Sequence, residues 1–191
     1  MALRQALLAV IVAAAVSCSQ KPEPARAAYD RYRNPDALVA ALAIEPGARV
    51  ADVGAGTGYL TIRLAAAAGP RGRVVATDID AAALATLDAG ARDAGVTVTT
   101  RVVRPDEPAL ERAGYDRILL SEVDQLLPDR AAYFRKLADA LAPRGGLAVA
   151  NRLPFRDAVR AAAAQAGLRE APPPGPAAVL PAQFLLFFRK E

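Results

Sequence analysis

The sequence predicts an α/β fold: a mostly parallel sheet that helices cover on both faces, with an antiparallel hairpin at one edge. The first observation is that short apolar runs alternate with longer amphipathic runs along most of the chain, as in consecutive strand–helix–strand units. The second concerns the last apolar run, 182–190, which follows a proline-rich loop with no helix between. Because a parallel pair needs a long crossover, this ending favours an antiparallel strand.

The elements follow from local signals in chain order. Asn34 and Pro35 predict the N-cap and first residue of a helix that continues through Ile44 and stops at the Pro46-Gly47 pair. Asp80 and Asp129 are expected to cap two later helices. We expect strands at 49–53, 73–77, 96–103, 116–120, 145–153 and 182–190. We expect further helices at 59–68, 80–94, 129–143 and 157–166.

The chain divides into three segments. We expect a signal segment at 1–18, a short exposed tether at 19–28, and one globular domain at 29–191. The 191 residues are 53% hydrophobic, which favours one domain with a proper core over disorder.

The first segment has the pattern of an export signal. Arg4 precedes a continuous apolar stretch, 6–16, which is too short to span a bilayer, and small residues then lead to Cys18. The sequence AVSC resembles the lipobox of bacterial lipoproteins, although Ala15 stands where leucine is favoured. The resemblance implies that Cys18 is lipidated, becomes the mature N-terminus and anchors the protein to a membrane. An ordinary secretory signal and an uncleaved anchoring helix are the alternatives.

Composition excludes several classes of site. The net charge is +4 without a dense Lys/Arg block, so no nucleic-acid surface is indicated. The chain has no histidine and one cysteine, which excludes a His-ligated metal, a histidine base, a cysteine-based zinc site and an internal disulfide. We therefore expect no metal.

The stretch VADVGAGTGYLTIRLA, 50–65, joins an expected strand to an expected helix through three glycines. A dinucleotide fingerprint starting at Gly54 needs its third glycine at position 59, which is tyrosine, and no P-loop lysine follows. The loop has no cation for a phosphate, and the carboxylate of Asp52 precedes it. Such an acidic, glycine-lined loop suits a ligand with positive charge and no phosphate, such as S-adenosylmethionine. An NAD(P)-dependent oxidoreductase is disfavoured by Tyr59, which we expect to pack on its helix.

This stretch closely resembles motif I of class I S-adenosylmethionine-dependent methyltransferases, and the resemblance extends over 34–191. It implies a Rossmann-like, doubly wound sheet of seven strands, with strand seven inserted antiparallel between strands six and five. It also implies S-adenosylmethionine as cofactor, with Asp78 accepting hydrogen bonds from both ribose hydroxyls and Asp106 near the adenine amino group. Capping of the next helix is the alternative for Asp78, and an ordinary loop carboxylate is the alternative for Asp106. The full set of implied cofactor contacts is Asp52, Gly54, Ala55, Gly56, Gly58, Asp78, Ile79 and Asp106.

The acceptor side is expected just beyond the fourth strand, in SEVDQLLPDR, 121–130. Glu122 and Asp124 are the candidate catalytic carboxylates there, and solvated loop charges are the alternative. Similar small bacterial methyltransferases carry a His-His pair at this place, where this chain has Gln125 and Leu126, so no imidazole can assist.

The function expected is a membrane-anchored methyltransferase of the bacterial cell envelope with an unknown methyl acceptor. Because S-adenosylmethionine is made in the cytoplasm, an enzyme on the cytoplasmic face of the inner membrane is one alternative. The other is a degenerate envelope protein that binds a nucleoside or S-adenosyl ligand without transferring methyl.

Overall fold

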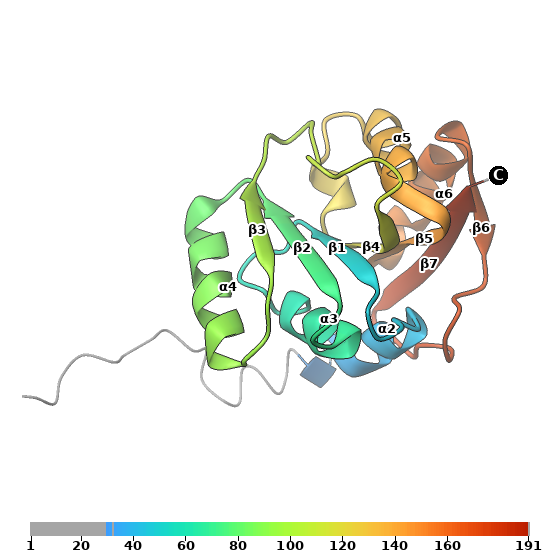
Figure 1. Ribbon diagram of the computed structural model, residues 1–191. Helices are drawn as coiled ribbons and strands as arrows, with labels where there is room; N and C mark the ends of the chain where they lie inside the picture. The colour runs from blue at the N-terminus through green and yellow to red at the C-terminus, as the bar shows by residue number, and fades with distance from the viewer. Residues whose placement is uncertain (1–29, 32, 191) are drawn as a thin grey trace, which may run out of the picture.

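The computed structural model describes residues 30, 31 and 33–190. These residues form a seven-stranded sheet in the order β3-β2-β1-β4-β5-β7-β6, with helices on both faces (Figure 1). The strands are β1 (Arg49–Val53), β2 (Arg73–Asp78), β3 (Thr99–Val102), β4 (Tyr115–Ser121), β5 (Leu141–Arg152), β6 (Leu168–Ala171) and β7 (Gln183–Lys190). The helices are α2 (Pro35–Ala41), α3 (Thr61–Ala68), α4 (Ala81–Asp93), α5 (Arg130–Ala140) and α6 (Arg156–Gln165), with short 3-10 helices at Asp124–Leu126 and Leu153–Phe155.

The strand directions confirm the fold class. Strands β1 to β5 pair in parallel, whereas β7 is antiparallel to both of its neighbours, β5 and β6. The last strand is therefore antiparallel, as the proline-rich loop without a helix indicated, and it is inserted next to β5, as the family resemblance implied. The carboxyl ends of β1, β2, β3 and β4 meet at one edge, where ligands bind in open α/β sheets.

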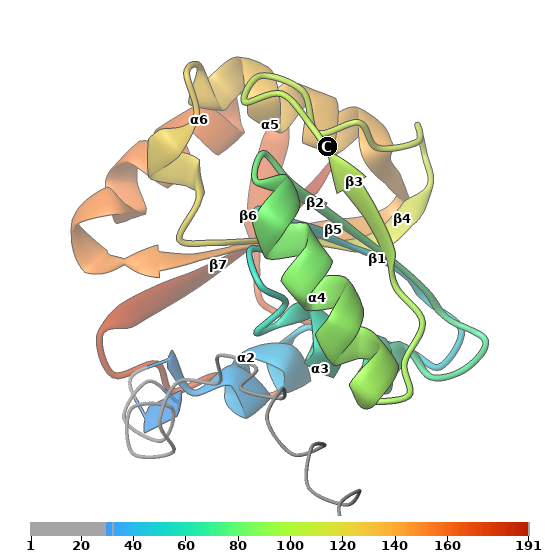
Figure 2. The same ribbon diagram turned by 90° about the vertical axis from the view of Figure 1, so that its left-hand side faces the viewer.

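Different helices cover the two faces of the sheet, because successive residues of a strand point to opposite sides. Val53 of β1 belongs to the buried cluster that includes Phe134 of α5. Val50, on the other face, packs in the cluster that contains Leu64 of α3, and Leu87 of α4 extends this second layer. Figure 2 shows α5 and α6 on one side of the sheet and α2 and α3 on the other.

One crossover differs from the rest. The connections β1–β2, β2–β3 and β4–β5 contain α3, α4 and α5, whereas the described chain between β3 and β4 contains no helix. We call this segment, 103–114, the crossover loop. Lys136 of α5 holds it by donating to the carbonyl of Asp106 and to Glu107, and Arg101 does so by donating to the carbonyl of Ala109. A loop instead of a helix therefore covers this part of the sheet.

Several boundaries differ from those expected. Asn34 occupies the N-cap position of α2 and Pro35 is its first residue, as expected, but the side chain of Asn34 makes no capping hydrogen bond. Its φ of 42° is left-handed, and its side chain donates instead to the carbonyl of Val179. The helix ends at Ala41, not Ile44, because Ala43 has a φ of 41°, which a helix does not tolerate.

Other elements are closer to expectation. Asp80 and Asp129 each cap a helix, as expected, by accepting backbone amide hydrogens. The strand expected at 96–103 is shorter, and the strand expected from 145 already begins at Leu141, which pairs with Tyr115 ahead of an irregularity.

The expected signal segment 1–18, with Cys18, and the tether 19–28 lie outside the described residues. In the part that is described, no helix is both long enough and apolar enough to cross a membrane.

Candidate functional site

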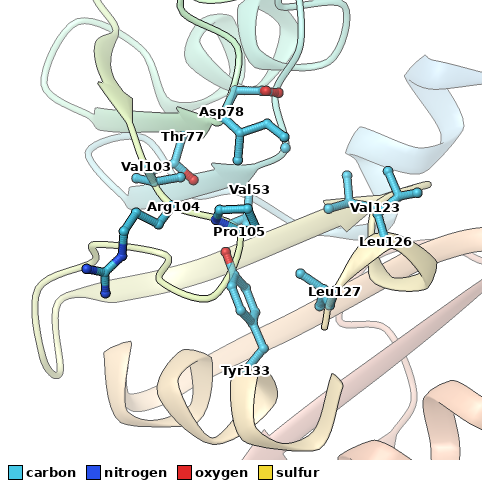
Figure 3. Close-up of a pocket in the computed structure, with 12 residues that line it drawn as sticks. Val53, Thr77, Asp78, Val103, Arg104, Pro105, Val123, Leu126, Leu127 and Tyr133 are labelled. Carbon is cyan, nitrogen blue, oxygen red and sulfur yellow. The ribbon is translucent and has the colours of Figure 1, made fainter. Parts of the chain in front are cut away.

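A pocket of about 280 Å³ lies at the carboxyl ends of β1, β2 and β3, beside the 3-10 helix that follows β4. Figure 3 shows its lining side chains converging from these elements and from α5. The lining residues are Val53, Gly54, Thr77, Asp78, Ile79, Val103, Arg104, Pro105, Val123, Leu126, Leu127 and Tyr133. Most of these residues are apolar, so the pocket suits a flat, uncharged ring with a few polar groups.

The loop 54–58, which we call the glycine loop, touches this pocket through Gly54. Gly54, Gly56 and Gly58 have φ values of 74°, 54° and 88°, in the region where residues with a Cβ are strained. A Cβ on Gly54 would lie 2.2 Å from a methyl carbon of Val123, whereas one on Gly56 would meet nothing within 4 Å. Gly54 thus lets the loop approach the chain after β4, and Gly56 leaves open space beside the loop.

Asp78, at the end of β2, holds the loop in place. One carboxylate oxygen accepts from the amide of Gly56 at 2.7 Å, and the other accepts from the amide of Asp80 at 3.0 Å. Each oxygen keeps a further lone pair, because an ionised carboxylate can accept about four hydrogen bonds. Since Asp78 also lines the pocket, it can accept from a ligand's hydroxyl groups.

A second polar atom in the pocket belongs to Thr77. Its residue is fully buried, and its hydroxyl has no hydrogen-bond partner among the described residues. A buried polar atom without a partner is costly, so a ligand that supplies one gains affinity. Thr77 was not among the residues expected from the sequence, and its side chain gives no motif by which to find it.

Asp52 lies behind the loop and not on the pocket wall. Its carboxylate is 3% exposed and accepts a hydrogen bond of 2.6 Å from the hydroxyl of Thr61. Burial raises the pKa of Asp52 to about 6, and the Thr61 hydrogen bond opposes that rise. The carboxylate is therefore largely ionised at neutral pH and adds negative charge near the loop.

Three other residues expected to contact the cofactor, Ala55, Ile79 and Asp106, differ in their surroundings. Ala55 packs against the α4 cluster, and its amide donates to the carbonyl of Thr77. Ile79 is 61% exposed at the pocket wall. Asp106 does not line the pocket: it lies exposed on the crossover loop and pairs with Arg104 at 3.3 Å.

The neighbours of Asp106 form the wall that the sequence did not reveal. Val103, Arg104 and Pro105 line the pocket from the crossover loop, and the hydroxyl of Tyr133 points toward Pro105 from α5 (Figure 3). The guanidinium of Arg104 points away from the other labelled side chains (Figure 3). The only sequence signal for this wall was its position directly after the third strand.

Glu122 follows β4 with a φ of 59°, an uncommon conformation for a residue with a side chain. Its carboxylate pairs with Arg33 at 3.3 Å and accepts a hydrogen bond from the amide of Gln183. Arg33 also donates to Ser121 at 2.7 Å and lies over the ring of Tyr59. The side chain of Glu122 is 27% exposed. The next residue, Val123, lies close to Gly54 of the glycine loop.

Asp124 is fully buried and pairs with Arg130 at 3.0 Å. It also accepts a hydrogen bond from Asn151, a buried residue of β5 whose amide reaches Gln125 as well. Neither Asp124 nor Glu122 lines the pocket. Asp124 therefore ties the chain after β4 to α5 and β5.

Tyr59 packs against the α2–α3 side of the core, as expected, and its hydroxyl donates to Asp30. Arg63 lies over the same ring and pairs with Asp30 and Asp36. These contacts attach the start of the described chain to the glycine loop and α3. No group of His, Cys, Asp and Glu side chains in the described part of the chain is arranged to hold a metal.

The chain matches the family model described as "Methyltransferase domain" over residues 51–147. A crystal structure of an S-adenosylmethionine-dependent methyltransferase from Aquifex aeolicus superposes with a TM-score of 0.74 at 18% identity, covering 88% of this chain and 98% of that one. The magnesium protoporphyrin IX methyltransferase of Synechocystis, solved with bound S-adenosylmethionine, superposes at 0.70 and 18% identity, covering 92% and 87%. No curated protein sequence matches the chain.

Proposed function

The chain belongs to the methyltransferase domain family, and we propose that it transfers a methyl group from S-adenosylmethionine to an acceptor. The observation that carries this proposal is the pocket at the strand ends, with Asp78 and the unpartnered hydroxyl of Thr77 on its wall. Both groups offer hydrogen bonds to a nucleoside, and the apolar remainder of the wall suits a base.

The residues present fit the cofactor part by part. We assign the ribose hydroxyls to Asp78, and the base to the apolar wall that includes Ile79 and Val103. The open space beside Gly56 takes the amino-acid part, where the negative charge of Asp52 attracts the sulfonium and the ammonium group. Bound S-adenosylmethionine supplies an activated methyl group, so positioning of the acceptor can provide much of the rate.

On the acceptor side, we propose Glu122 as the carboxylate that faces the acceptor, because its side chain is partly exposed and lies next to Val123. Arg33 and Gln183 orient it. Asp124 has a different role in this proposal: its pairing with Arg130 and Asn151 positions the chain on which Glu122 lies.

A second candidate function is a binding protein that holds an S-adenosyl ligand or nucleoside without transferring methyl. The specific observation in its favour is that both carboxylates near the acceptor side have internal partners. Transfer and binding differ in one measurable way, the fate of a labelled methyl group.

Calorimetry of the full chain with S-adenosylhomocysteine and with NAD tests the cofactor assignment. We expect micromolar binding of the first and none of NAD, because the glycine loop has no cation for a pyrophosphate. Asp78→Ala should weaken binding more than tenfold, and Thr77→Val severalfold. Asp106→Ala is the matched control and should bind as the wild type does. Equal affinity of all four proteins would refute the assignment.

We further propose that Cys18 is lipidated and holds the enzyme at a membrane of the cell envelope. The support is the apolar stretch 6–16 directly before the one cysteine of the chain. A fatty-acid analogue should label the wild type but not Cys18→Ser. An intact Met1 on the membrane-bound protein would instead favour an uncleaved helix on the cytoplasmic face.

A further inference from the structure

A second pocket, of about 260 Å³, lies where β1 and β2 begin. It is at the opposite ends of these strands from the pocket that Asp78 lines, which we call the cofactor pocket. Three arginines from three adjacent strands line the second pocket: Arg49 of β1, Arg73 of β2 and Arg101 of β3. We call it the arginine pocket. It is open because the crossover loop, and no helix, covers this part of the sheet.

Arg49 and Arg73 are directly paired in the parallel register of β1 and β2. Neighbouring strands lie about 4.8 Å apart, so two like charges at this position repel each other. Both residues are exposed at the pocket, and within the described residues neither forms an ion pair. The carboxylate of Asp116 accepts a hydrogen bond from the backbone amide of Arg49 at 2.8 Å and does not pair with its guanidinium. The two adjacent guanidinium groups therefore have no ion-pair partner within the described residues.

The surroundings hold part of this pair in place. The guanidinium of Arg49 lies 5.4 Å from the ring centre of Tyr115, which is 1% exposed. The hydroxyl of Tyr115 donates to Glu111, which also pairs with Arg101. These two hydrogen bonds hold the pKa of Glu111 at about 2, so its negative charge is committed to Arg101. The uncompensated charge of the pocket thus belongs to Arg49 and Arg73.

We propose that the arginine pocket binds a small soluble anion that carries a phosphate group, held between Arg49 and Arg73. Guanidinium groups bind phosphate oxygens through two parallel N–H donors, and a phosphate dianion matches the two positive charges. Thr97 and Thr99 also line the pocket, and a threonine hydroxyl can donate a further hydrogen bond. A bound anion also removes the repulsion between the two arginines.

The site is linked to the cofactor pocket through the crossover loop. The first residues of this loop line the cofactor pocket, and Glu111 near its end lines the arginine pocket. A phosphate held between Arg49 and Arg73 lies in the same pocket as Glu111 and repels its carboxylate, which alters the contacts that hold the loop. Phosphate should therefore change the affinity for S-adenosylhomocysteine, and this link rests on the proposed function.

Calorimetry of the full chain with inorganic phosphate tests the site itself. We expect saturable binding of one phosphate at millimolar levels in chloride buffer, weakened at least tenfold by Arg49→Gln combined with Arg73→Gln. The control combines Arg71→Gln with Arg92→Gln, which removes the same charge from exposed residues that do not line the pocket. It should bind phosphate within twofold of the wild type. Equal weakening in both double variants, or no saturable binding, would overturn the proposal.

A stability measurement separates a binding role from a structural one. In phosphate-free buffer Arg73→Gln should melt at or above the wild-type temperature, because it removes a repulsion. Phosphate should raise the melting temperature of the wild type but not of Arg73→Gln. A variant that melts lower without phosphate would show a structural role and contradict the proposal. An unchanged affinity for S-adenosylhomocysteine in phosphate would refute the link, whereas the phosphate titration alone decides the site.

Discussion

The carboxylates near the glycine loop differ in burial, and burial determines which of them can contact a ligand. Asp78 is half-buried and keeps acceptor capacity toward the pocket, while Asp52 is buried behind the loop and Asp124 is enclosed by Arg130 and Asn151. Their residue types are the same, and only their surroundings separate a ligand contact from a structural charge. Motif spacing predicts which acidic residues are near the site, but not how far each is buried.

The buried carboxylate of Asp52 makes stability depend on pH. Its folded pKa of about 6 exceeds the ordinary value of 3.8, so the folded protein binds more protons than the unfolded chain between these values. The free energy of unfolding therefore falls as pH rises through this window, by about 2 kcal/mol between about pH 4.5 and pH 7. Urea unfolding at several pH values should show that the free energy of unfolding falls less with rising pH in Asp52→Asn than in the wild type. Identical pH slopes would contradict the raised pKa.

Glu122 combines a strained backbone with side-chain contacts, and substitutions can separate the two. Glu122→Ala loses the contacts and keeps the left-handed φ, which costs about 1 kcal/mol in any residue with a Cβ. Glu122→Gly loses the same contacts without that strain, so it should be at least as stable as Glu122→Ala in urea. At the exposed helical residue Ala161, the change to glycine should instead destabilise by about 1 kcal/mol. If the protein with glycine is less stable than the protein with alanine at position 122 as well as at position 161, the backbone of Glu122 is not strained.

At the scale of single elements, the shape of the glycine loop depends on its individual glycines. Gly54→Ala places a methyl group 2.2 Å from Val123, whereas Gly56→Ala meets no neighbour and only strains φ. We expect Gly54→Ala to lose clearly more stability in urea than Gly56→Ala, which should lose about 1 kcal/mol. Gly56→Val should retain the fold but lose S-adenosylhomocysteine binding. A stable Gly54→Ala would mean that the loop and Val123 are farther apart than described.

Across the whole molecule, sequence reasoning succeeded where the signal is local or periodic. The alternating apolar runs predicted the parallel pairing of the first five strands, and the missing last helix predicted an antiparallel last strand, whose insertion beside β5 followed from the family resemblance. Prediction from the sequence failed where contacts between distant residues determine the local structure. Asn34 turns its side chain toward Val179, and Leu141 joins β5 by pairing with Tyr115. The pocket wall from Val103 to Pro105 was missed because a loop without a motif forms it.

The molecule is an enzyme only if it transfers a methyl group, and binding of the cofactor alone does not establish this. The most direct measurement is incubation of the full chain with methyl-labelled S-adenosylmethionine and an envelope extract of the source organism. We expect the label to move to a protein, lipid or small molecule, and we expect Glu122→Gln to slow this transfer while leaving the affinity for S-adenosylhomocysteine nearly unchanged. If the cofactor binds and no label leaves it, the methyltransferase proposal is contradicted and the binding-protein alternative holds.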